Sequence, residues 1–141
     1  MATSATDYLD ALWRDYTAIT PQAARIHALF AARGETIVND HVALRTYGRP
    51  GIELATMARP FLARGWEPRD DYRFDDKHLR ARYFQHPDPA LPKVFISELC
   101  VDELSAEAAA TIDALVAQLP AGFGDRDDLP YAGRSEERRV G

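Results

Sequence analysis

A histidine and an arginine four residues apart are the side chains in this sequence that best suit a small-molecule site. His41 and Arg45 lie in the run 37–47, where residues alternate with the period of a β-strand. This period places both side chains on one face, with Cα atoms about 13 Å apart at the usual strand rise. An imidazole suits a transition metal, and a guanidinium suits a carboxylate. The pair is therefore a candidate site for a metal and an organic anion, although a surface arginine beside a hydrogen-bonded histidine gives the same pattern.

Glu98 is a second candidate, because it is an acidic residue in the strongly β-prone run 93–99. An unpaired carboxylate among apolar neighbours is costly, so Glu98 must be paired, protonated or bound to a metal. We favour an ion pair with Arg80 or Arg82 on a neighbouring strand. The alternative is that Glu98 acts as a metal ligand or general base.

The remaining polar residues form no recognisable catalytic motif. His78 and His86 lack the spacing of known metal motifs, so a self-contained metal site is poorly supported. Cys100 has no histidine or asparagine at the spacing of a cysteine nucleophile. We therefore predict no catalytic residue from the motifs of this chain.

Hydrophobic periodicity and turn residues predict the elements that position these side chains. Helices are predicted at 6–19, from Pro21 to Gly34, from Leu54 to Gly65, and from Ser105 to Pro120. Strands are predicted at 37–47, 66–74, 78–84 and 93–99, and a loop at 121–132. Pro60 is expected to kink the third helix or break it into two short pieces.

The order of these elements predicts an α+β fold, a single βαβββ module with two helices before it and one after it. Such a module is a half-open curved sheet. It can bury its concave face by pairing with a second module or by closing on another structure. No second copy of the pattern is visible in the sequence. A homodimer in which two chains supply the two halves is one possibility.

Length and charge exclude several classes of protein. The chain has 141 residues, which suits one domain, and a net charge of −5, which disfavours binding to nucleic acid. We expect no membrane association, because no apolar run reaches the roughly 20 residues that cross a bilayer. The lone Cys100 cannot form an internal disulfide, and this fits a reducing cytoplasm best.

The last eight residues, 134–141, show no apolar period, cap or turn signal. They look like the translation of a sequencing adapter, so we predict a non-native tail. On this interpretation the natural protein continues past about Gly133, and residues 1–133 are an N-terminal part of a longer domain. A charged, solvated tail of a complete protein is the alternative.

Three runs in order, 38–46, 77–88 and 91–99, resemble the 2-oxoadipate dioxygenase/decarboxylase family. The resemblance covers about Tyr8 to Leu119, and members of the family are substantially longer than this chain. It implies a vicinal-oxygen-chelate fold of the glyoxalase type, which agrees with the βαβββ order of the predicted elements.

The resemblance also implies the chemistry. Members of the family use iron(II), Fe(2+), to convert 2-oxoadipate and O2 to 2-hydroxyglutarate and CO2 in lysine breakdown. By this resemblance His41 is a metal ligand and Arg45 binds the substrate carboxylate. The other ligands, a histidine and a glutamate, are expected in a second module that these residues lack. Glu98 is therefore not counted as an iron ligand, and the isolated chain is expected to be inactive.

Two other functions on the same scaffold remain open. In a glyoxalase-like, metal-dependent lyase or isomerase, Glu98 and His41 from two chains would hold the metal together. In a non-catalytic module, the pocket would bind a small acid without metal.

Overall fold

The computed structural model describes residues 3–36 and 40–131. Its central unit follows the predicted βαβββ order, which confirms the predicted fold class. It comprises β1 (His41–Tyr47), α3 (Leu54–Leu62), β2 (Glu67–Phe74), β3 (Leu79–Gln85) and β4 (Lys93–Leu99). The helices α1 (Ala5–Ile19) and α2 (Pro21–Ala32) precede it, and α4 (Ala106–Val116) follows. Short 3₁₀ turns lie at η1 (Asp75–Lys77), η2 (Val101–Glu103) and η3 (Phe123–Asp125). The proposed tail at 134–141 lies outside the described residues.

The four strands form one sheet in the order β1-β4-β3-β2. β1 and β4 run parallel, and the other neighbours are antiparallel. In the parallel pair His41 lies opposite Lys93, and Arg45 lies opposite Ser97. The first and last strands of the unit are therefore neighbours, although about fifty residues separate them along the chain.

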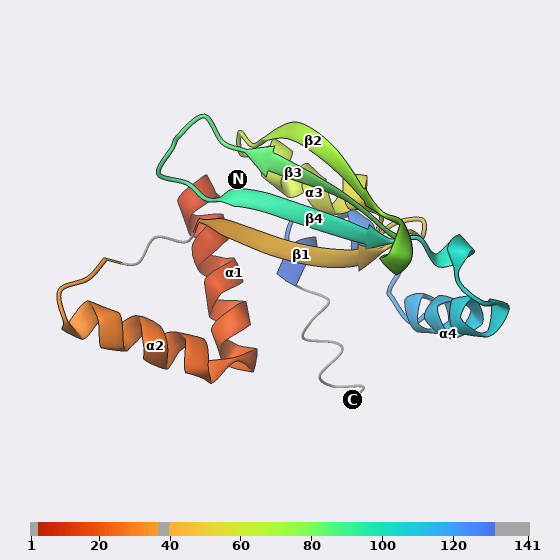
Figure 1. The fold of residues 1–141 in the computed structure, drawn as a ribbon, viewed down its shortest axis with the longest axis horizontal. Helices are drawn as coiled ribbons and strands as arrows, with labels where there is room; N and C mark the ends of the chain where they lie inside the picture. The colour runs from red at the N-terminus through yellow and green to blue at the C-terminus, as the bar shows by residue number, and fades with distance from the viewer. Residues whose placement is uncertain (1–2, 37–39, 132–141) are drawn as a thin grey trace.

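The two faces of the sheet differ in what covers them. α3 packs on one face, where Phe61 and Ile96 are fully buried. Tyr8 of α1 joins this core through an edge-to-face contact with Phe61, with ring centroids 5.4 Å apart. Figure 1 shows α3 behind the strands and no helix in front of them. Among the described residues the other face is therefore open.

Local signals explain where most helices begin and end. Ser4 caps α1 by accepting a hydrogen bond from the Asp7 backbone N–H at 3.1 Å. Ser105 caps α4 in the predicted way, accepting from the Ala108 N–H. Pro21 is the first residue of α2. Gly34 follows the end of this helix and has a φ of +80°, a conformation that commonly ends helices.

The apolar side chains of α2 are not part of the core. α2 contains no buried residue in this structure, and Ile26, Leu29 and Phe30 are all exposed. The helix extends away from the sheet beside α1 (Figure 1). No helix in the described part of the chain is long and apolar enough to cross a bilayer.

Of the kink or break predicted at Pro60, the break into two pieces is wrong and the kink stays a prediction. α3 is one helix from Leu54 to Leu62, and Pro60 lies inside it, buried in the core. The helix ends two residues after the proline. The missing N–H therefore costs one hydrogen bond near a helix end, and the packing of Phe61 and its neighbours holds the turn in place.

The segment predicted as a loop at 121–132 is partly helical in its described part, at 123–125 and 129–131, and it contributes to the core. Phe123 and Leu129 are buried with the side chains of α1 and α3. The Tyr8 hydroxyl donates to the Asp127 carbonyl at 2.6 Å, and Arg64 forms an ion pair with the Asp127 carboxylate. This segment therefore closes the helix-covered side of the module.

Substituting Gly124 is expected to loosen this closure. A Cβ added at Gly124 would lie 1.9 Å from the Gly51 carbonyl oxygen, so one backbone segment must shift. We expect Gly124→Ala to lower the free energy of unfolding by about 2 kcal/mol in urea denaturation. The matched variant Ala121→Ser, at an exposed position in the same segment, should change it by less than about 0.5 kcal/mol. Equal stability of the two variants would show that the segments do not approach so closely.

Candidate functional site

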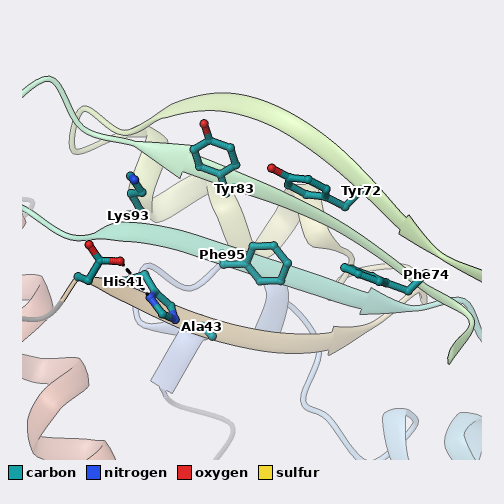
Figure 2. A pocket seen from close by; sticks show the side chains of 8 residues that line it. His41, Ala43, Tyr72, Phe74, Tyr83, Lys93 and Phe95 are labelled. Atoms are coloured by element: carbon teal, nitrogen blue, oxygen red, sulfur yellow. Dashed lines mark hydrogen bonds and ion pairs between the residues drawn. The ribbon is translucent and has the colours of Figure 1, made fainter.

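The open face of the sheet carries a pocket of about 560 Å³. All four strands contribute to it, and Figure 2 shows the lining side chains above the strands. Four aromatic rings form most of its wall, and polar groups lie at the β1 end. The lining residues are Asp40, His41, Ala43, Tyr72, Phe74, Tyr83, Lys93 and Phe95. The four aromatic residues and Lys93 were not among the site residues predicted from the sequence.

The aromatic wall is a continuous surface rather than a set of isolated side chains. The Tyr72 and Tyr83 rings are stacked, with centroids 6.3 Å apart. The Tyr72 and Phe95 rings are 6.2 Å apart. Each of these residues lies on a different strand, so the wall depends on strand pairing. The alternation of residues along each strand shows which side chains share a face of that strand. It does not show which strands are neighbours in the sheet.

His41 is the first residue of β1, and its side chain lies at the edge of the pocket (Figure 2). Its Nδ1 lies 3.4 Å from a carboxylate oxygen of Asp40, and 61% of the His41 side chain is exposed. A carboxylate that accepts the Nδ1 proton leaves the lone pair of Nε2 free. His41 can therefore act as a metal ligand or hydrogen-bond acceptor here, and its role stays a prediction.

Arg45 lies on the same face of β1 as His41, two pleats further along the strand. Both residues are exposed. The residues on either side of Arg45, Leu44 and Thr46, face the core instead. The Arg45 Nε donates a long hydrogen bond of 3.5 Å to the Ser97 hydroxyl, and none of the ion pairs among the described residues involves Arg45. The guanidinium is therefore available to a carboxylate, and its binding role also stays a prediction.

Glu98 lies on the opposite face of the sheet from His41 and is only 3% exposed. One carboxylate oxygen accepts from the Arg80 guanidinium at 2.5 Å, which confirms the favoured ion pair. The other oxygen accepts from the Leu54 backbone N–H at 2.8 Å, at the start of α3. The Glu98 carboxylate in turn raises the pKa of Arg80. Glu98 therefore holds α3 on the sheet and does not point into the pocket.

The other histidines have structural partners. Arg73 and His78 donate to Glu103 and together lower the pKa of that carboxyl to about 2. His86 contacts the Arg64 carbonyl at 3.0 Å and packs against Trp66. Within residues 3–36 and 40–131, no three histidine, cysteine or carboxylate side chains are grouped so that they could hold a metal ion.

A βαβββ unit with one face covered by α3 and a pocket on the other defines an α+β module with a candidate ligand site on its open face. The model of the 2-oxoadipate dioxygenase/decarboxylase family matches residues 8–125. The chain belongs to this family.

Relatives show how much of a family member this chain represents. A rice 2-oxoadipate dioxygenase/decarboxylase, named as chloroplastic or amyloplastic, is 38% identical over an alignment of 93 residues, and the match covers 59% of this chain and 26% of that protein. A Shewanella frigidimarina protein provisionally described as a hydrolase superposes with a TM-score of 0.87 at 42% identity, covering 94% of this chain and 52% of that one. The rice hydroxyglutarate synthase, solved with 2-oxoadipate, gives 0.74 at 31% identity, with 86% and 41% covered. The chain thus spans from about a quarter to about half of the length of these proteins.

Proposed function

We propose that this chain forms part of an iron(II)-dependent enzyme that converts 2-oxoadipate and O2 to 2-hydroxyglutarate and CO2. Family membership and the 2-oxoadipate complex of the rice relative support the substrate class. One geometric observation carries the proposal: His41 and Arg45 share the open face of β1, beside a pocket of about 560 Å³. The reaction balances, because all the atoms of 2-oxoadipate and O2 appear in the two products.

The residues present fit a partial metal site. His41 offers one imidazole, and the described residues hold no complete group of ligands, so we expect the remaining ligands outside them. Asp40 beside Nδ1 would orient the ring, as acidic partners of metal-binding histidines do. Iron(II), when bound, would supply the activation of O2 and of the 2-oxo acid.

The task of this chain is to bind and orient the substrate. Arg45 would bind one carboxylate through paired, charge-assisted hydrogen bonds and so determine which end of the diacid faces His41. The rings of Tyr72, Tyr83 and Phe95 offer an apolar wall to the methylene chain and exclude water from that side. The pocket therefore suits a small molecule with anionic ends and an apolar middle.

Product analysis tests this proposal. The complete product of the gene that encodes this chain would be loaded with iron(II) and given 2-oxoadipate and O2. We expect one O2 consumed and one CO2 released for each 2-hydroxyglutarate formed. Conversion without O2 uptake would instead indicate a lyase or isomerase. Ligand binding that survives complete removal of iron, without turnover, would indicate a non-catalytic module.

The position of Glu98 argues against the lyase or isomerase in which Glu98 and His41 share a metal. Glu98 is buried on the helix-covered face, and both of its oxygens have partners. We retain two further predictions within the proposal. Two copies could pair through the open face, and the unpaired Cys100 fits a reducing compartment such as the cytoplasm.

A further inference from the structure

We propose that Lys93 is a second substrate-binding residue, which binds the carboxylate adjoining the keto group while Arg45 binds the distal carboxylate. The inference rests on the proposed function and concerns the same pocket. It assigns a separate cation to each end of the diacid.

Strand pairing places Lys93 beside the candidate metal ligand. Lys93 lies opposite His41 in the parallel β1–β4 pair, and both side chains line the pocket (Figure 2). The Lys93 backbone N–H donates to the Asp40 carbonyl at 3.0 Å, which ties the beginning of β4 to the residue before His41. A group bound at His41 is therefore within reach of the Lys93 side chain.

The charge of Lys93 is not neutralised by its surroundings. Lys93 is exposed, and none of the ion pairs among the described residues includes it. Asp40, the acidic residue in the pocket lining, contacts His41 instead. By contrast, Arg49, Arg64 and Arg80 each pair with an acidic residue. A lysine left unpaired at the edge of an aromatic pocket is well placed to bind an anion.

The spacing of the two cations suits a diacid. Lys93 and Arg45 are one strand apart and four residues offset, so their Cα atoms are separated by roughly 13 Å or slightly more. A six-carbon diacid is shorter than this separation, and the long side chains of lysine and arginine can bridge the difference. Both carboxylates can therefore be bound at once, with the aliphatic chain along the aromatic wall.

A comparison of two ligands tests the assignment. 2-Oxohexanoate has the carboxylate beside the keto group but lacks the distal one of 2-oxoadipate. Binding of both would be measured by calorimetry to the complete gene product, loaded with iron(II) and kept free of oxygen. We expect Lys93→Met to weaken both ligands by about the same factor, roughly tenfold for a lost charge-assisted hydrogen bond. Arg45→Met should weaken 2-oxoadipate by a similar factor and leave 2-oxohexanoate unchanged.

Lys77→Met is the matched control, because it removes the same charge from η1, outside the pocket. It should leave both affinities unchanged, and Lys93→Arg should restore part of the lost affinity. Urea denaturation of each variant would show whether the protein remains folded. Suppose that the unsubstituted protein binds 2-oxoadipate. If Lys93→Met then changes neither affinity, or changes only the affinity for 2-oxoadipate, the assignment of Lys93 to the carboxylate beside the keto group is wrong. The proposed function is not affected by that result. If the unsubstituted protein binds neither ligand, both proposals fail.

Discussion

Replacing His41 with alanine should abolish the proposed reaction by removing the metal. We expect His41→Ala to weaken iron(II) binding to the complete gene product by more than about 100-fold, because loss of a partner that only orients a ligand already costs 10- to 100-fold. O2 uptake with 2-oxoadipate should fall to background. Metal analysis after dialysis against a weak chelator measures the first effect, and an oxygen electrode measures the second.

Two variants make the His41 result specific. His27 is an exposed histidine on α2, so His27→Ala removes an imidazole outside the pocket and should leave the iron content unchanged. Asp40→Asn keeps a side chain of the same shape but removes the carboxylate beside His41 Nδ1, so its effect should be intermediate. Retention of stoichiometric iron by His41→Ala would refute the assignment of His41 as a ligand.

The second large effect is expected on stability, at Glu98. Glu98→Ala removes the acceptor of the Leu54 N–H at the start of α3 and leaves a void beside it. A buried N–H without a partner and the loss of a charge-assisted hydrogen bond together should cost about 3 kcal/mol. Urea denaturation of this chain, monitored by circular dichroism, measures this change in the free energy of unfolding.

Controls separate the two bonds of Glu98. The Arg80 side chain is 64% exposed but Glu98 is buried, so Arg80→Met leaves a buried carboxylate without its counter-charge and should cost about 2 kcal/mol. Glu98→Gln can still accept from Leu54 and should cost less than Glu98→Ala. In the complete gene product, Glu98→Gln should also leave the iron content unchanged. Loss of iron in this variant would restore the alternative in which Glu98 and His41 share a metal.

The sequence by itself determined most elements and the faces of their residues. Alternation in β1 placed His41 and Arg45 on the face opposite Leu44, and the bounds of β4 agree with the predicted 93–99. Caps and turn residues predicted where the helices begin, as Ser105 shows for α4. These features depend on residues close together in the chain, and the spacing of neighbouring residues records them directly.

Only the tertiary structure decided which residues meet across the sheet. The parallel pairing of β1 with β4 brought Lys93 beside His41, and the packing of α3 brought the Leu54 N–H to Glu98. The tertiary structure also buries Phe123, which lies in a segment that was predicted to be a loop. These contacts join residues far apart in the chain. Their free energy depends on how whole elements pack, and no local pattern of residue types encodes that packing.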